Sequence, residues 1–540
     1  QVEEGKQPYH YEDCVLVYNG EIYNYKDLSH NPKTDTETLA KGLKKEGWEF
    51  LKKCDGMFAL AFYNKTTKEL ILARDTNGTK PLYYGYLKDK LYFSSEIKSL
   101  LECGFERKIC KQALGLYYNQ GYVPGYLTMF EGIRKFVPGE VFVNGQMHNL
   151  LDYDLPQVDN LDINHVKRNV QLKHNYSVKQ TLMGRRNIGL FLSGGLDSTS
   201  ILYEMKELGV KPRTFTSSFA TTDPKSKLNQ DSEIAKRVCD EWGIENNMLY
   251  QTQQDYVDAL EDTFYALEEP RQGKSFPTYY NTNKFMSENG VIVTLSGDGG
   301  DEIFTGYKHH VKGDWRNKLN SLGMSHRGLN NPELQITLDE QMDYLYEWLP
   351  TAPIQGDAIN DMMYIECMNT LAEDFLIRND KLGMNFSMEA RFPLMCNVIR
   401  DYIRTIPSSY KAVIKHKPNN KKTFKAKTLF KKAYEERLPE YIVRKKKTGW
   451  RFPTDEILIG DAATPGRDDS TLRQYIFETL KDKEVREIFE LDDDTIWNFM
   501  DNKNFTPNKG SKFAPAMLRQ KELFTILNFA VWKKVFKMSI

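Results

Sequence analysis

Short runs of alternating hydrophobic and polar residues, separated by tight polar turns, characterise the chain from residue 14 to residue 96. A period of two places successive side chains on opposite faces of a strand, so this pattern predicts strands that bury one face. Hydrophobic runs on either side of a short polar turn predict antiparallel hairpins. Two such hairpins are expected, residues 56–63 with 68–75 and residues 81–87 with 90–96.

The pattern changes beyond about residue 160, where apolar strands alternate with amphipathic helices. Such alternation predicts a parallel, doubly wound sheet rather than an antiparallel one. The expected strands are 187–192, 214–220 and 246–252, and the expected helices are 162–183 and 231–243.

The length of 540 residues exceeds what one hydrophobic core usually organises, so two domains are expected. The change of pattern places their boundary after Tyr153, which gives domains at 1–153 and 154–540. The expected fold class is α+β with antiparallel sheets in the first domain and α/β with a doubly wound parallel sheet in the second. After Tyr307 we expect only helices, the last of which carries Trp532 on an apolar stripe that packs against the core.

The charge balance limits the classes of binding partner, and the cysteines indicate the redox state of the compartment. The chain has 74 Lys and Arg residues and 74 Asp and Glu residues, so no net charge favours nucleic acid or an anionic membrane. It shows no apolar run long enough to span a bilayer and no signal peptide at Gln1. Its seven cysteines include no CxxC pair, which indicates reduced thiols. A cytoplasmic protein with a small polar or anionic substrate is expected, and a homo-oligomer remains open.

The sequence NIGLFLSGGLDSTSILYEMKEL at 187–208 combines an apolar strand, a glycine turn and an amphipathic helix. Gly194 and Gly195 let the backbone turn sharply and leave its N–H groups available for an anion. The hydroxyls of Ser193 and Ser198 and the positive end of the helix dipole add further favourable contacts. This stretch therefore predicts a nucleotide phosphate site.

Asp197 lies within this turn, where a bare carboxylate would repel a phosphate. A bridging Mg²⁺ explains the position, because this ion prefers carboxylate and phosphate oxygens together. The lysine of a GxxxxGK[ST] loop is absent, so transfer of the γ-phosphate is disfavoured. SGGLDS instead resembles the pyrophosphate loop of the ATP pyrophosphatases, which split ATP into AMP and pyrophosphate. An ordinary strand-turn-helix junction is the alternative.

A second apolar strand runs into an acidic, glycine-rich turn, VIVTLSGDGGDEIFTGY, at 291–307. Ligands of parallel sheets bind at the carboxyl ends of the strands, so this turn is expected to meet SGGLDS in space. Asp298, Asp301 and Glu302 would then add carboxylates near the triphosphate. Asp197 and Asp301 are the pair expected to share Mg²⁺. An acidic turn exposed to solvent is the alternative.

The motifs YNGEIYN, TDTE, GMFALAF, LARDTNGTKPLYY and FSSEIKSLL follow one another in the first domain. In this order they resemble the N-terminal-nucleophile glutaminase domain of glutamine-dependent asparagine synthetases, over about 7–139. The resemblance implies an αββα sandwich in which Asn19 and the Gly20 N–H stabilise an oxyanion. It also implies that Glu21 and Asp35 hold the amino end of glutamine. Asp35 is further expected to cap the helix that begins at TDTETL.

The nucleophile of that family is an N-terminal cysteine whose α-amine serves as the base, and position 1 here is Gln1. Cys14 cannot replace it, because Cys14 lies inside a predicted strand without a free amine and fits a buried apolar position. The opening strands and arginine-bearing loops of the family's domain are also missing. We expect the sequence to omit segments of the natural chain, and a degenerate glutaminase half is the alternative.

The second domain resembles the synthetase domain of the same family. Within SGDGGDE, the resemblance implies that Asp301 binds metal and that Asp298 lies near the activated substrate. Residues 378–395 resemble the substrate-side helix of the family and its RxPFLD turn. The turn itself departs from the family, because LMC replaces FLD at 394–396.

The most basic tract of the chain lies at 422–453 and is interrupted by Gly449 and Pro453. It resembles the RxKxGFxxP motif of the family, which implies that Lys447 stabilises the departing pyrophosphate. Lys427 is a second candidate for contact with ATP or pyrophosphate. A solvated, charged face is the alternative for both lysines.

Together the motifs predict an ATP-dependent, amide-forming ligase that uses ATP and Mg²⁺. By resemblance, it makes asparagine from aspartate through a β-aspartyl adenylate, with ammonia from glutamine. Amidation or cyclisation of a different carboxylate stays open, because the FLD turn is replaced. An inactive scaffold or binding protein and a nucleic-acid-modifying pyrophosphatase are further alternatives. The retained motifs disfavour the first of these, and the neutral charge disfavours the second.

Overall fold

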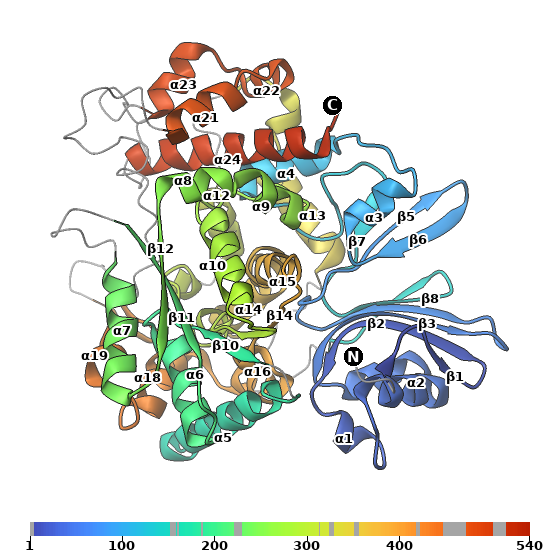
Figure 1. Ribbon diagram of the computed structural model, residues 1–540, viewed down its shortest axis with the longest axis vertical. Helices are drawn as coiled ribbons and strands as arrows, with labels where there is room; N and C mark the ends of the chain where they lie inside the picture. The colour runs from blue at the N-terminus through green and yellow to red at the C-terminus, as the bar shows by residue number, and fades with distance from the viewer. Residues whose placement is uncertain are drawn as a thin grey trace.

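The computed structural model (Figure 1) describes residues 5–151, 158, 161–184, 187–220, 229–312, 314–322, 329–349, 356–416, 422–445, 471–500 and 515–539. Antiparallel sheets from the first part of the chain, mostly in blue, lie beside a parallel sheet from the later part, mostly in green. We call these parts the first region and the second region. The expected combination of an α+β and an α/β fold is confirmed.

Two antiparallel sheets form the first region. The larger has six strands in the order β1-β2-β3-β4-β8-β9, and the smaller has three in the order β6-β5-β7. Both predicted hairpins are present, as the antiparallel pairs β3–β4 and β5–β6. The strands are β1 (Tyr9–Tyr11), β2 (Cys14–Ile22), β3 (Gly56–Asn64), β4 (Leu70–Arg74), β5 (Tyr83–Leu87), β6 (Lys90–Ser94), β7 (Ile133–Lys135), β8 (Glu140–Val143) and β9 (Gln146–Asn149).

The two faces of the larger sheet bury different partners, as the alternation in its sequence predicts. On β3, Phe58 and Phe62 pack with residues of helix α2 (Asp35–Glu46). Ala59 and Ala61, which point the other way, pack with residues next to the smaller sheet. The first region is therefore a helix layer on two stacked sheets.

Helix α2 begins where TDTETL predicts, but its cap is Thr34 rather than Asp35. Thr34 Oγ1 accepts a hydrogen bond from the Glu37 N–H at 3.1 Å. Asp35 is the first helical residue, and its carboxylate accepts from the Tyr18 hydroxyl at 2.7 Å and from the Ile22 N–H at 3.2 Å. The predicted cap is wrong. Thr34 and Asp35 could each accept a hydrogen bond from a free N–H at the start of this helix, and the Asp35 carboxylate instead accepts hydrogen bonds from residues of β2.

A five-stranded parallel sheet forms the second region, in the order β12-β11-β10-β13-β14. From β10 the chain adds strands on one side and then returns to add β13 on the other. Doubly wound sheets bind their ligands at such a reversal. The strands are β10 (Ile188–Phe191), β11 (Thr214–Phe219), β12 (Asn246–Gln251), β13 (Val293–Leu295) and β14 (Glu389–Arg391).

Helices cover both faces of this sheet (Figure 1), as the alternating pattern predicts. Residues of three helices pack in one core with β10 and β13, and Met286 of a fourth packs in a separate cluster with Phe215 of β11. The first three are α5 (Ile163–Thr181), α6 (Leu196–Glu207) and α7 (Gln230–Trp242), and the fourth is α10 (Phe276–Glu288).

The expectation of helices alone after Tyr307 is wrong, because strands follow it. β14 joins the parallel sheet beside β13, and β15 (Val413–His416) pairs with β16 (Lys422–Lys425). Strands of three or four residues carry too few positions for a period of two to stand out from the surrounding helical pattern. β14 brings Arg391 to the boundary with the first region, where it contacts Glu21.

Helices make up most of the remaining described chain. The segment η5 (Cys367–Leu376) is π-helical, a rare form that often marks functional sites. No helix in the described ranges is both long and apolar enough to cross a bilayer. The other α-helices are α1 (Tyr25–Leu28), α3 (Ile97–Glu102), α4 (Lys111–Gln120), α8 (Gln253–Asp258), α9 (Leu260–Leu267), α11 (Gly300–Ile303), α12 (Trp315–Leu322), α13 (Leu338–Trp348), α14 (Ala358–Glu366), α15 (Ile377–Met384), α16 (Asn397–Thr405), α17 (Ser408–Lys411), α18 (Thr428–Tyr434), α19 (Glu440–Val443), α21 (Thr471–Thr479), α22 (Lys483–Phe489), α23 (Asp493–Met500) and α24 (Pro515–Phe536), and the 3₁₀ turns are η2 (Gly47–Lys53), η3 (His310–Lys312), η4 (Pro332–Leu334) and η6 (Pro393–Met395).

The last helix, α24, packs against the core as predicted. Trp532 is fully buried, and its indole N–H donates to the Glu268 carbonyl at 2.8 Å. The same core contains Tyr117 and Phe130 from the first part of the chain. A shared core fixes the two regions relative to each other.

Candidate active site

The loop predicted from SGGLDS follows β10 at the carboxyl end of the parallel sheet. Gly194 has a φ of +66°, and a Cβ there would lie 2.4 Å from the Asp231 carbonyl oxygen of α7. Only glycine satisfies both constraints, so the sequence dictates the sharp turn. Gly195 precedes the first residue of α6, and Ser193, Gly195 and Leu196 line a cavity.

Two hydroxyl groups lie together in this loop. The Oγ atoms of Ser193 and Ser198 are 3.0 Å apart, and the Ser193 N–H donates to Ser198 Oγ at 3.2 Å. Both residues line the cavity at the N-terminus of α6. The two hydroxyls and the helix dipole are therefore arranged to hold an anion.

The acidic turn after β13 packs directly against this loop, as the position of both turns predicts. A Cβ on Gly297 would lie 2.9 Å from the Ser198 nitrogen. A Cβ on Gly300 would lie 2.7 Å from Asp197 Cγ. Close approach between the two motifs therefore explains why SGDGGDE needs glycine at these positions.

Asp197 and Asp301, the predicted Mg²⁺ ligands, both contact the Lys427 ammonium. Lys427 Nζ is 2.5 Å from Asp197 Oδ2 and 2.8 Å from Asp301 Oδ1. Burial alone would lower the pKa of Lys427, but the two carboxylates outweigh it and hold this pKa above its ordinary value. The residue that the sequence predicted only as a second candidate therefore lies at the centre of the site.

The donor set fits Mg²⁺. Oxygens of Asp197 and Asp301 lie within ion-pair distance of one nitrogen, so they are close enough to share one small cation. Mg²⁺ binds proteins through one or two carboxylates and completes its shell with phosphate oxygens and water. The two carboxylates would therefore hold Mg²⁺ together with a phosphorylated substrate.

These residues border one cavity of about 470 Å³, which is large enough for a substantial organic ligand. Its wall includes Lys431 and Lys445 from the basic tract. Lys445 Nζ lies 2.7 Å from Asp231 Oδ1 and donates to the Gly194 carbonyl at 3.1 Å, which ties the tract to the phosphate loop. Burial and the nearby Lys427 ammonium lower the pKa of Lys431.

Another part of the cavity wall combines a carboxylate with a buried guanidinium. Asp298 accepts hydrogen bonds from the Ser296 hydroxyl and, at 2.7 Å, from Asn379 Nδ2. The Arg378 guanidinium lies 3.6 Å from Asp298 Oδ1 and 4.1 Å from the centre of the Tyr279 ring. Opposite charges held side by side suit a small acid that carries both a carboxylate and an ammonium group.

Several residues of the cavity were missed by the sequence reasoning. Arg378 carried one signal, its place in the stretch that resembles the substrate-side helix, but no role was assigned to it. Tyr279 lies on α10 and carried no signal, because a lone tyrosine on a helix is usually a packing residue. Lys447 lies outside the described residues, so its role stays a prediction.

The residues predicted to bind glutamine lie on β2 and at the start of α2. Asn19 Nδ2 donates to Ser95 Oγ at 3.4 Å. Glu21 faces the second region, because its Oε2 lies 3.3 Å from Arg391 Nη2 on β14. The predicted oxyanion donor and the predicted ammonium acceptor therefore come from the strand that contacts the parallel sheet.

Gly20 and Asp35 complete this group. A Cβ on Gly20 would lie 2.0 Å from the Met57 carbonyl oxygen, so only glycine fits there. The pKa of the Tyr18 hydroxyl is raised by burial and then by Asp35 and Glu21, which places both carboxylates around one ring. The structure brings these residues together, and their part in binding glutamine stays a prediction.

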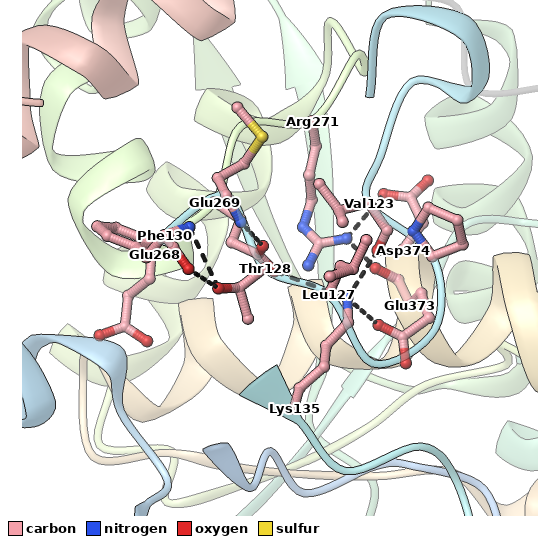
Figure 2. Close-up of polar contacts among 12 residues, drawn as sticks. Val123, Leu127, Thr128, Phe130, Lys135, Glu268, Glu269, Arg271, Glu373 and Asp374 are labelled. Atoms are coloured by element: carbon pink, nitrogen blue, oxygen red, sulfur yellow. Dashed lines mark hydrogen bonds and ion pairs between the residues drawn. The ribbon is translucent and has the colours of Figure 1, made fainter. Parts of the chain in front are cut away.

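Buried charges join the two regions. Glu373 of η5 lies 2.7 Å from Lys135 Nζ and 3.3 Å from Arg74 Nη1, both of which belong to the first region. Arg271 donates to the Glu373 carbonyl and lies 3.9 Å from Asp374 Oδ1 (Figure 2). The side chains of Arg74, Lys135, Arg271 and Glu373 are at most 3% exposed, so a change of any one leaves a buried charge unbalanced.

An antiparallel sandwich is thus joined to a parallel sheet that carries an anion-binding loop. Both parts match family models: the model described as Asparagine synthase matches residues 173–534, and the model described as Glutamine amidotransferase domain matches residues 1–153. These matches define the class, a ligase with an amidotransferase domain. The chain belongs to the asparagine synthase family.

Curated relatives extend the similarity over the whole chain. Asparagine synthetase [glutamine-hydrolyzing] 1 of Bacillus subtilis (strain 168) is 26% identical over 604 residues, covering 99% of this chain and 88% of the relative. Putative asparagine synthetase [glutamine-hydrolyzing] 2 of Methanocaldococcus jannaschii is 31% identical over 320 residues, covering 56% of this chain and 60% of the relative. Amidase chry2 of Gibberella zeae is 26% identical over 331 residues, covering 56% of this chain and 49% of the relative.

Proposed function

We propose that this protein makes asparagine from ATP, aspartate and ammonia, with glutamine as the source of the ammonia. The observation that carries the proposal is that two sets of groups line one cavity. One set suits the phosphates of ATP and consists of Asp197, Asp301 and Lys427. The other suits a zwitterionic acid and consists of Asp298 and Arg378. Two substrates held side by side in one cavity gain the rate advantage of proximity.

ATP would place its phosphates at the N-terminus of α6, beside Ser193 and Ser198. Asp197 and Asp301 would hold Mg²⁺, which would neutralise phosphate charge. The Lys427 ammonium contacts both carboxylates and would pair with phosphate oxygens. These contacts favour the release of pyrophosphate, because they stabilise negative charge that grows as it departs.

Two displacements then give the amide. A carboxylate oxygen of aspartate attacks the α-phosphorus of ATP, the bond to the bridging oxygen breaks, and pyrophosphate leaves with that electron pair. Ammonia attacks the acyl carbon of the β-aspartyl adenylate, AMP leaves, and the nitrogen loses a proton. Asp298 is the carboxylate proposed to accept this proton, and its bonds from Ser296 and Asn379 would orient it.

Lys447 is proposed to assist the first displacement. Lys447 belongs to the basic tract at 422–453, which also supplies Lys431 and Lys445 to the cavity wall. If Lys447 stabilises the departing pyrophosphate, then Lys447→Ala should lower turnover by about two powers of ten while leaving ATP binding in place.

Glutamine is proposed to bind in the first region, with Asn19 and the Gly20 N–H as oxyanion donors. Glu21 and Asp35 would hold the amino end of the substrate. The contact of Glu21 with Arg391 supports communication between the sites, since Arg391 belongs to β14 of the synthetase sheet. Free ammonia is the alternative source of nitrogen.

A different carboxylate is the second candidate substrate, and the turn at 394–396 favours it. Met395 replaces the family residue there and packs on the acidic turn, since a Cβ on Gly299 would lie 2.3 Å from Met395 Sδ. Gly299 follows Asp298 directly, so this replacement alters the support of the acid-binding wall. One similar protein is named an amidase rather than an asparagine synthetase.

Aspartate labelled with ¹⁸O in its side-chain carboxylate tests the proposal. With ATP, Mg²⁺ and ammonium, one labelled oxygen should appear in AMP, because the attacking oxygen stays on the α-phosphorus. Unlabelled ADP together with label in inorganic phosphate, the result of attack on the γ-phosphorus, would contradict the adenylate. Label transfer from another acid, with none from aspartate, would assign the second candidate.

A further inference from the structure

A second cluster of polar side chains lies just beyond the acidic turn and does not line the cavity. His309 and His310 lie two and three residues after the end of the motif SGDGGDEIFTGY at 296–307, and Glu366 is the last residue of α14. One nitrogen or oxygen of each residue lies within 4.8 Å of the other two. His309 Nε2 is already 3.1 Å from Glu366 Oε2.

His310 is the unusual member of this cluster. Its side chain is fully buried, and neither ring nitrogen has a hydrogen-bond partner among the described residues. A buried polar group without a partner costs about 1–3 kcal/mol relative to one that is paired. Such groups are rare in folded proteins and call for a specific explanation.

We propose that His309, His310 and Glu366 bind a divalent transition-metal ion such as Zn²⁺. Two imidazole nitrogens and one carboxylate oxygen are a donor set that Zn²⁺ accepts, with water in the fourth position. Mg²⁺ prefers oxygen donors and is not expected here. The site therefore differs in chemistry from the pair Asp197 and Asp301.

The three side chains need only small shifts to reach one ion. Bonds from Zn²⁺ to nitrogen or oxygen are about 2.0–2.2 Å, so two ligand atoms cannot be more than about 4.3 Å apart. The separation of up to 4.8 Å must therefore shorten. His309 is 30% exposed, so its ring has room to turn toward the buried His310.

Lys318 competes for the same carboxylate. Its ammonium contacts Glu366, donates to Thr370 Oγ1 at 2.9 Å and lies 4.2 Å from the centre of the Trp315 ring. A metal ion on Glu366 would lie close to this positive charge, which weakens its binding. Replacing Lys318 with a neutral residue should accordingly tighten the metal site.

Tyr307 links this site to the cavity. Its ring stacks on His309, with ring centres 5.1 Å apart, and its hydroxyl donates to Glu302 at 2.8 Å. Tyr307 and Glu302 both line the cavity. A metal ion that fixes His309 would therefore restrain one wall of the nucleotide cavity.

Titration of the nucleotide-free protein with Co²⁺ tests the proposal, because Co²⁺ replaces Zn²⁺ and its visible spectrum reports the ligands. Excess Mg²⁺ keeps Co²⁺ away from Asp197 and Asp301. We expect one Co²⁺ to bind each chain and to give the spectrum of nitrogen and oxygen ligands. A thiolate-to-metal band would instead place the ion on a cysteine and overturn the proposal.

Single substitutions locate the ion. His309→Gln and Glu366→Gln are each expected to weaken Co²⁺ binding at least about tenfold. His165→Gln, on the exposed face of α5, is the matched control and should change nothing. Lys318→Met keeps all three ligands and should bind more tightly, so it remains informative if a ligand variant fails to fold. Undiminished binding in His309→Gln, or no binding in Lys318→Met, would refute the site.

Discussion

Lys80 Nζ lies 2.7 Å from Asp380 Oδ1, and this fully buried ion pair joins the first region to helix α15 of the second. Removing one partner of a buried pair leaves an uncompensated charge, which costs more than the pair itself contributes. We expect Lys80→Met to lower the free energy of unfolding by about 3–5 kcal/mol. The double variant Lys80→Met with Asp380→Leu should regain much of this loss in a denaturant titration.

The exposed pair of Lys108 and Glu131 provides the control, since its atoms are 2.9 Å apart and its side chains are 45% and 52% exposed. Lys108→Met should change stability by less than about 1 kcal/mol. A double variant at 80 and 380 that is no more stable than the single one would show that the pair stabilises the folded chain outright.

Gly300→Ala should impair catalysis through Asp197. The new methyl group would lie 2.7 Å from Asp197 Cγ and 2.9 Å from Leu394 Cδ1, so the carboxylate must move. A displacement of about 1 Å in a group at the reacting site lowers the rate about 100-fold. AMP formation measures the effect, and Gly5→Ala is the control, because its nearest contact would be 3.7 Å away. Equal activity of the two variants would mean that Asp197 tolerates displacement.

Lys427→Met should make folding depend on Mg²⁺. Without the ammonium, the partly buried carboxylates of Asp197 and Asp301 repel each other unless another cation lies between them. The melting temperature of the variant should therefore rise more on addition of Mg²⁺ than that of the wild type. If Mg²⁺ raises the melting temperatures of Lys427→Met and the wild type equally, Asp197 and Asp301 do not share the ion.

Asp197→Ala and Asp301→Ala should each abolish pyrophosphate release while leaving the fold intact.

The free energy of unfolding is expected to depend on pH through the Glu140 carboxyl. Burial raises the pKa of its carboxyl to about 7, and Oε2 accepts from the Val137 N–H at 3.0 Å. The folded chain thus keeps a proton that the unfolded chain releases above about pH 4.3, so stability falls as pH rises between these values.

Glu140→Gln removes this titration and keeps an oxygen that can accept from Val137. We expect the variant to be more stable than the wild type by about 1–3 kcal/mol at about pH 8, and nearly equal to it below about pH 4. Glu131→Gln, at an exposed position, should show no such difference. The same stabilisation at both pH values would assign the effect to packing rather than to the proton.

The sequence predicted those features that local patterns encode. Alternation identified the hairpins, and the glycines of SGGLDS and SGDGGDE identified two turns at the carboxyl ends of parallel strands. The contact of Gly300 with Asp197 follows from that arrangement.

Contacts between residues far apart in the sequence left no local sequence pattern that could predict them. Arg378 and Tyr279 reach the cavity from two helices whose packing is set by the whole core. Glu373 lies within a π-helical segment that the periodicity of 3.6 does not describe. Lys135 forms its buried ion pair with Glu373 only because the two regions pack together, and no local pattern in the sequence indicates this pair.

Exchange of labelled pyrophosphate into ATP tests the central claim most directly, because it reports adenylate formation without the nitrogen donor. With Mg²⁺ and aspartate, exchange should occur and should disappear in Asp197→Ala. A panel of other amino acids and sugar acids should support little or none. Exchange with another acid but not with aspartate would contradict the asparagine assignment, and no exchange with any acid would contradict adenylate formation itself.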